Sequence, residues 1–369
     1  MALARHPHFY LPDGDLVVCS GPGDNEHSTV FRVNKTVLAY NSPVFQDMFA
    51  LPSNPSTQEM YEETPMVRVT DSADELEQLI EALYNPGWVR FVIECALYSG
   101  AHESTSRSLF VPRWHPDMPL RFSKIMKLAT KYQFDSVRKR IVNAMEDSWP
   151  RTFPDWLRFK AEAAALEQDY HYDGQRTAAK RLDDCVPEPA SAIRFARDFD
   201  VPSILPFAFY TLATIDSDAD WDAERQKEPE AQQYPKTYCA RWALLQPDDY
   251  RRLLRGRKAF AYDVSAVVQR YADSDLLANM ETSNDCLNGG ECFDCLRGID
   301  TIWREGTLSA TSNMVCTSAP DPLGLLERLH ELAEDDHKSL CDPCLKALRA
   351  DIRCQQDIVW NDIPGAFRL

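Results

Sequence analysis

The sequence predicts an α+β protein with a small sheet and helices at its N-terminus, an all-α region after it, and a cysteine-rich, zinc-binding helical C-terminal segment. Three observations predict this order. Short apolar runs between turn residues come first, and apolar positions at helical spacing follow. Seven of the 11 cysteines then fall between Cys286 and Cys354. We expect three regions, with bounds 1–148, 149–279 and 280–369.

Three strands are expected in the first region. The apolar run Asp15–Cys19 follows the turn residues Pro12-Asp13-Gly14, and a second apolar run covers Val30–Val33. The residues between the two runs are rich in glycine and proline, which predicts a β-hairpin with a long loop. The apolar residues Met66–Val69 predict a further strand.

Helices are expected between and after these strands. Ser42 followed by Pro43 provides an N-cap and a first-position proline. Ser72 and Glu75 have the spacing of a capping box, and the apolar residues after them recur on one helical face. Helical spacing also predicts helices over 35–40, 121–132 and 135–147.

The residues of this region resemble a known family. The string FRVNKTVLAYNSPVFQDMF is similar to the signature of BTB/POZ domains, and Asp13-Gly14-Asp15-Leu16 precedes it. The strings VRVTDSADELEQLIEALYNP and KIMKLATKYQFDSVRKRIV continue the resemblance in the family's order. Asn34 stands where the family usually has histidine, but asparagine can still hydrogen-bond to local backbone. An insertion at Gly87–Met118 lies near the edge that forms a cullin-type partner groove in the family.

The resemblance implies association. BTB domains typically form homodimers through their N-terminal elements and bind other proteins with the remaining surface. We therefore expect a homodimer with protein partners that the sequence does not identify, a cullin-type ubiquitin ligase among the alternatives. Most apolar residues here, such as Leu38 and Leu128, are expected to be core rather than site residues.

The middle region is expected to be helical. The predicted helices are broken by prolines and cover 155–170, 189–199, 202–214 and 236–271. The acidic stretch Asp216–Glu230 is expected to be a solvated loop. The strings AIRFARDFDVPSILPFAFY, CARWALLQPDDYRRLLRGRKAF and IVWNDIPGAFRL resemble segments of fungal, basidiomycete-like BTB proteins. In the last string, Trp360, Ile363 and Phe367 are expected to dock on the preceding helices.

The charge of the chain excludes some classes of partner. The formal net charge is −17, which opposes binding to phosphate backbones and to anionic membranes. A dense basic cluster, Arg251, Arg252, Arg255, Arg257 and Lys258, is interpreted as a solvated helix face. No apolar run is long enough to span a membrane, and the first residues lack a secretory signal. We expect an intracellular protein, in the cytoplasm, the nucleus or both, that binds neither nucleic acid nor membrane.

The clustered cysteines predict a metal site, because disulfides rarely persist inside cells. Cys341 and Cys344 form a CxxC pair before an amphipathic helix. Either Cys292 with Cys295, or Cys286 with Cys292, can complete a site of four thiolates for zinc. His330 and His337 are alternatives for one thiol. We expect a structural zinc, since the sequence shows none of the motifs of a catalytic zinc site.

The motifs of common enzyme classes are also not found, and we expect a protein that is not an enzyme. The predicted function is a protein-interaction adaptor. Its alternatives are a substrate receptor of a cullin-type ubiquitin ligase, a transcriptional scaffold and an unrecognised enzyme.

Overall fold

The computed structural model describes residues 3–22, 27–52, 58–85, 114–172, 182–226, 238–272, 295, 297–306, 319–335 and 340–369. The chain divides into two compact units. The first comprises Met1–Ser148 with Gln168–Lys180 and Asp184–Pro187, and the second comprises Trp149–Glu167, Arg181–Asp183 and Glu188–Leu369. The predicted boundary at residue 279 lies outside the described residues, so the three-region division stays a prediction.

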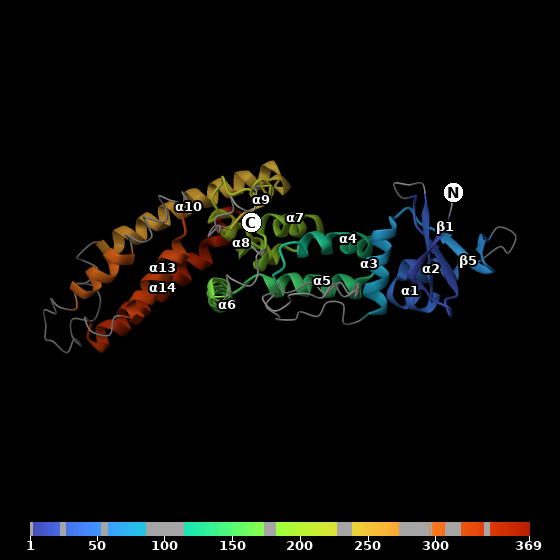
Figure 1. The fold of residues 1–369 in the computed structure, drawn as a ribbon. Coiled ribbons are helices and arrows are strands. Elements are labelled where there is room, and N and C mark those ends of the chain that lie inside the picture. The colour runs from blue at the N-terminus through green and yellow to red at the C-terminus, as the bar shows by residue number, and fades with distance from the viewer. Residues whose placement is uncertain are drawn as a thin grey trace. The chain divides into compact units, whose positions relative to one another are not determined.

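The described part of the first unit contains a five-stranded sheet with the strand order β1-β3-β2-β5-β4 (Figure 1). The strands are β1 (Leu3–Tyr10), β2 (Leu16–Cys19), β3 (Ser28–Val33), β4 (Met60–Tyr61) and β5 (Thr64–Arg68). β2 and β3 are antiparallel, which confirms the predicted hairpin. β5 runs parallel to β2, and β1 runs parallel to β3.

The sheet curls so that its two edge strands approach each other. Tyr10 in β1 donates a hydrogen bond from its hydroxyl to the Glu62 carboxylate at a distance of 2.8 Å, and Arg5 also pairs with Glu62. Glu62 lies in the turn between β4 and β5. Leu3, Tyr10 and Tyr61 consequently cover one apolar face of the sheet, formed by Val17, Cys19, Val30 and Met66.

Five helices are described in the first unit: α1 (Lys35–Asn41), α2 (Pro43–Ala50), α3 (Ala73–Tyr84), α4 (Met118–Lys131) and α5 (Asp135–Ser148). Two predicted caps are confirmed. The Ser42 side chain accepts a hydrogen bond from the Phe45 backbone N–H, and Ser72 with Glu75 forms a capping box. The apolar faces of α4 and α5 are fully buried at Ile125, Leu128 and Ile141.

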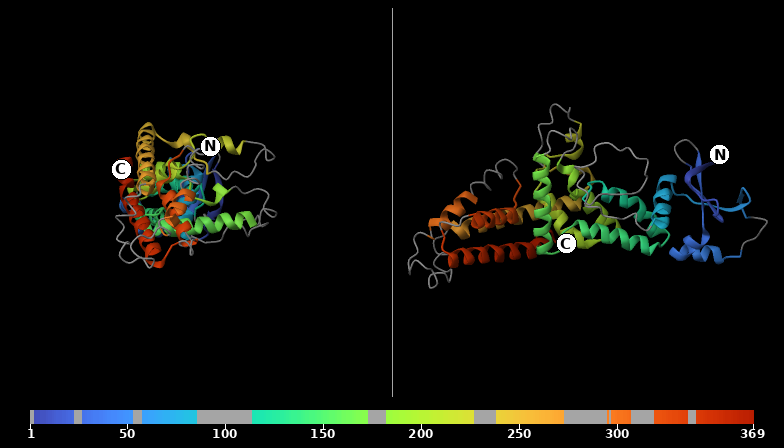
Figure 2. Two further views of the ribbon diagram at one scale, coloured as in Figure 1. Left: turned by 90° about the vertical axis from the view of Figure 1, so that its left-hand side faces the viewer. Right: turned by 60° about the horizontal axis from the view of Figure 1, so that its bottom comes forward.

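The second unit is helical throughout its described elements, as the sequence predicts. Its α-helices are α6 (Phe153–Tyr172), which belongs to this unit up to Glu167, α7 (Pro189–Phe199), α8 (Leu205–Ala213), α9 (Trp221–Arg225), α10 (Pro247–Ala272), α13 (Pro322–Asp335) and α14 (Asp342–Phe367). Residues 297–306 are also helical. α13 and α14 lie side by side, and α10 packs along α14 (Figures 1 and 2). No described helix is long and apolar enough to cross a membrane.

Aromatic side chains from distant helices form the core of this unit. The Phe367 ring at the end of α14 lies 5.2 Å from the Phe209 ring and 5.3 Å from the Phe260 ring. Ile363 and Phe367 are buried, and the Trp360 ring lies 5.9 Å from that of Phe207. The expected docking of the C-terminal residues on the preceding helices is confirmed.

Two predictions for the middle region are wrong. The helix expected over 236–271 begins only at Pro247, because the Trp242 indole donates to the Ala219 carbonyl at 3.1 Å and holds the preceding residues in another conformation. The acidic stretch Asp216–Glu230 is not simply a solvated loop. Its Trp221 begins the short helix α9 and is buried.

Candidate functional site

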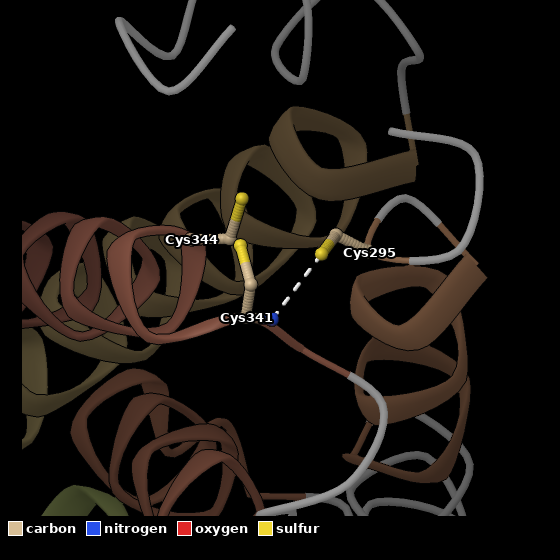
Figure 3. A group of neighbouring side chains, drawn as sticks. All are labelled: Cys295, Cys341 and Cys344. Carbon is tan, nitrogen blue, oxygen red and sulfur yellow. Dashed lines mark hydrogen bonds between the residues drawn. The ribbon is translucent and has the colours of Figure 1, made fainter. Parts of the chain in front are cut away.

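Three cysteine side chains meet at the N-terminus of α14 (Figure 3). The Sγ atoms of Cys295, Cys341 and Cys344 all lie within 4.8 Å of one another. Cys341 is the N-cap residue of α14, and Cys344 lies in its first turn. Cys295 comes from the segment that leads into the helix at 297–306. A search of the described ranges finds this one group of potential metal ligands.

Two features of the surroundings suit a negatively charged sulfur ligand. The backbone N–H of Cys341 donates a hydrogen bond of 3.3 Å to the Cys295 Sγ, and this bond favours a negatively charged sulfur. The N-terminus of α14 also favours negative charge through its helix dipole. Cys295 and Cys344 are buried, whereas Cys341 is partly exposed. The group is therefore largely shielded from water.

The geometry of the group fits zinc. With Zn–S bonds of about 2.3 Å, the sulfur atoms of a tetrahedral site lie about 3.8 Å apart. That distance falls within the 4.8 Å that bounds the separations of the three sulfur atoms. Thiolates are soft ligands that suit zinc rather than magnesium or calcium.

The other predicted ligands have different outcomes. Cys286, Cys292 and His337 lie outside the described residues. His330 in α13 is described but lies outside the cysteine group, and its Nδ1 is 3.6 Å from a Glu334 carboxylate oxygen. Burial, with a smaller effect of Arg353, lowers the pKa of His330. Cys354, which is not among the predicted ligands, is exposed on α14 and lies outside the group.

In the first unit, Asn34 joins the sheet to α3. Its side-chain amide donates to the Asp13 carbonyl at 3.3 Å. The Tyr84 hydroxyl donates to Asn34 Oδ1 at 3.0 Å and accepts from the Asn34 backbone N–H at 2.8 Å. Burial raises the pKa of Tyr84, so the hydroxyl stays a donor at neutral pH. At the position where the family usually has histidine, Asn34 thus bonds both to the backbone of Asp13 and to the side chain of the distant Tyr84.

Four large apolar side chains in the described part of the first unit are exposed, and Tyr40 and Leu51 are the two most exposed of them. Tyr40 in α1 is 89% exposed, and Leu51, directly after α2, is 68% exposed. Single exposed apolar residues are common on protein surfaces. Tyr40 belongs to α1 and Leu51 follows α2, and these two helices pack on each other, so both residues are candidate positions for contact with another protein.

The exposed apolar side chains of Tyr40 and Leu51 suit contact with another protein. Comparison with protein-family models matches the BTB/POZ domain to residues 22–88. The chain therefore contains a BTB/POZ domain in its first unit, and such domains are typically interaction modules without enzymatic activity. A search of curated proteins gave no match.

Proposed function

We propose that this chain is a protein-interaction adaptor that homodimerises through its BTB/POZ domain and recruits other proteins. The match at residues 22–88 is the observation that carries the proposal. Homodimerisation supplies two copies of every other surface of the chain, which strengthens binding to a partner with two sites. The proposal includes no enzymatic activity.

The contact between the two copies is proposed to include Tyr40 and Leu51. Two differently tagged copies, expressed together, should co-purify. Tyr40→Glu places a charge in an apolar contact and should reduce co-purification strongly. Asn143→Glu is the matched control, because it adds the same charge at an exposed position of α5, outside the two helices of the proposed contact. Equal recovery of wild type and Tyr40→Glu would reject this surface as the dimer contact.

The class of partner is a finer part of the proposal. One version is a substrate receptor of a cullin-type ubiquitin ligase, and another is a transcriptional scaffold. Purified cullin N-terminal region, titrated against the full chain, separates the two, because only the first version requires binding. An intracellular location in the cytoplasm or nucleus remains a prediction from the sequence pattern, and membership of the fungal, basidiomycete-like type remains a prediction that rests on the resemblance alone.

A structural zinc is the proposed cofactor. Cys295, Cys341 and Cys344 would supply three thiolates. Of the two predicted ligand sets, the position of Cys295 in this group supports the pair of Cys292 with Cys295 over that of Cys286 with Cys292. A fourth thiolate would close the tetrahedral site and leave no position for a reacting water. The metal would join the segment before 297–306 to α14.

Elemental analysis of the purified full chain tests the zinc proposal, with about one equivalent expected for a single site. The double substitution Cys341→Ser/Cys344→Ser should abolish binding and lower the thermal stability of the second unit. Cys354→Ser is the matched control, since Cys354 lies on the same helix outside the group. Less than a tenth of an equivalent, in protein never exposed to chelator, would contradict the proposal.

A further inference from the structure

The basic cluster of α10 separates into two sets in the structure. Arg252 donates to the backbone carbonyls of Phe367 and Arg368 and so caps the end of α14. Arg257 is partly buried, where burial lowers its pKa, and it donates to the Ile215 carbonyl. These two arginines hold the second unit together. Arg251, Arg255 and Lys258 are exposed instead.

Large apolar side chains share the exposed side of α10 with these cations. Leu254 is 66% exposed, Tyr262 is 74% exposed and Tyr250 is 38% exposed. Tyr250, Leu254, Lys258 and Tyr262 follow one another at intervals of four residues, so they form one row along the helix. We call Tyr250, Arg251, Leu254, Arg255, Lys258 and Tyr262 the outer face of α10.

The charge of the outer face is opposite to that of the whole chain. The formal net charge is −17, but the one carboxylate between residues 250 and 269 is that of Asp263, which is partly buried and faces Asp362. Arg251 pairs with Asp248 at 2.6 Å, an exposed pair of low stability. Within the described residues, Arg255 and Lys258 have no ion-pair partner.

We propose that the outer face of α10 docks an acidic amphipathic segment of a partner protein. This inference rests on the proposed adaptor function and names the chemistry of one partner. Leu254 and Tyr262 are eight residues apart, or about 12 Å along a helix, which matches apolar side chains two turns apart on a helical partner. Carboxylates beside those side chains would pair with Arg255 and Lys258.

Other occupants fit less well. Nucleic acid and anionic membranes present extended anionic surfaces, which would meet the acidic rest of a chain with net charge −17 as well as the three exposed cations, whereas a short acidic segment would meet the outer face alone. The phosphate backbone of a nucleic acid also gives no role to the exposed Leu254. A second copy of the chain would present the same basic face at a symmetric contact, where like charges repel.

Fluorescence anisotropy of a labelled 16-residue acidic peptide, with leucines at intervals of four residues, tests the proposal on the full chain. The wild type should bind the peptide, and binding should weaken with salt. Arg255→Glu/Lys258→Glu should weaken it by about tenfold or more, and Leu254→Ala/Tyr262→Ala by a similar factor. If charge reversal disturbs folding, Arg255→Gln/Lys258→Gln is the milder variant to use.

A matched control is available on α4, where Leu120, Arg121 and Lys124 are also exposed. Arg121→Glu/Lys124→Glu changes the net charge equally and should leave binding unchanged. Equal binding of a scrambled peptide, of a single-stranded oligonucleotide or of phosphatidylserine vesicles would overturn the proposal. So would loss of the dimer in the α10 variants, which would assign the face to a second copy. A dimer that binds no peptide would overturn this inference alone and leave the adaptor proposal standing.

Discussion

Gly256 shows how a single residue limits the packing of two helices. A Cβ atom at this position of α10 would lie 1.9 Å from Phe367 Cε1, and Phe367 is fully buried. Gly256→Ala should therefore destabilise the second unit by about 1–3 kcal/mol through overpacking. Thermal unfolding followed by circular dichroism checks this result.

Gly365, in α14, is the matched control for that substitution. A Cβ there would meet no atom within 4 Å. Gly365→Ala should leave stability unchanged or raise it by up to about 1 kcal/mol, because alanine has the higher helix propensity. Similar losses in both variants would contradict the steric explanation.

His330 predicts a pH dependence of the second unit. Burial and Arg353 lower its pKa, Arg349 acts in the same direction, and Glu334 and Glu327 oppose them. A base with a lowered pKa in the folded state binds protons more readily when unfolded. The contribution of neutral His330 to the free energy of unfolding should thus be fully present above the ordinary histidine pKa of about 6.5. It should decrease as the pH falls below that value. Melting temperatures between pH 7.5 and pH 5 measure this slope, which His330→Gln should reduce.

The role of a residue can be predicted from the sequence when its signal is local. Clustered cysteines indicate a metal site because their spacing is a local signal, and the structure brings Cys295, Cys341 and Cys344 together. The requirement for glycine at position 256 has no local signal. It comes from Phe367, which is more than a hundred residues further along the chain.

At the scale of elements, the capping box of α3 is the sharpest prediction. The Glu75 backbone N–H donates to Ser72 Oγ at 3.3 Å, and the Ser72 N–H donates to the Glu75 carboxylate at 3.3 Å. Ser72→Ala should destabilise the first unit by about 1 kcal/mol. Ser72→Thr keeps the hydroxyl and should lose much less, as measured by urea denaturation. An equal loss in both variants would show that the cap is not the cause.

Elements defined by local patterns can be predicted from the sequence, and those defined by distant contacts cannot. β2 and β3 have apolar runs bounded by turn residues, and both are confirmed. β1 has no such signal, because His6 is its one buried residue and no apolar alternation reveals it. α10 starts later than predicted because the residues before it bond to residues 219–221 instead of forming helix. The Trp221 backbone N–H, for example, donates a hydrogen bond of 3.0 Å to the Ala240 carbonyl.

At the scale of the whole molecule, the predicted order of a small sheet with helices followed by helices is confirmed. The signature residues around Asn34 indicate a BTB/POZ domain by themselves, and the family model places this domain at residues 22–88. Partners leave no comparable pattern in a sequence, because they depend on which side chains of a helix remain exposed. The outer face of α10 is set apart from the rest of its basic cluster only by the contacts that Arg252 and Arg257 make inside the unit.

Self-association is the central claim, and light scattering of the purified full chain tests it most directly. The monomer has a mass of 42.1 kDa, so a homodimer has a mass of 2 × 42.1 = 84.2 kDa. We predict the dimer mass at micromolar concentration, independent of salt because the proposed contact is apolar. A mass of 42.1 kDa across that range would contradict the claim.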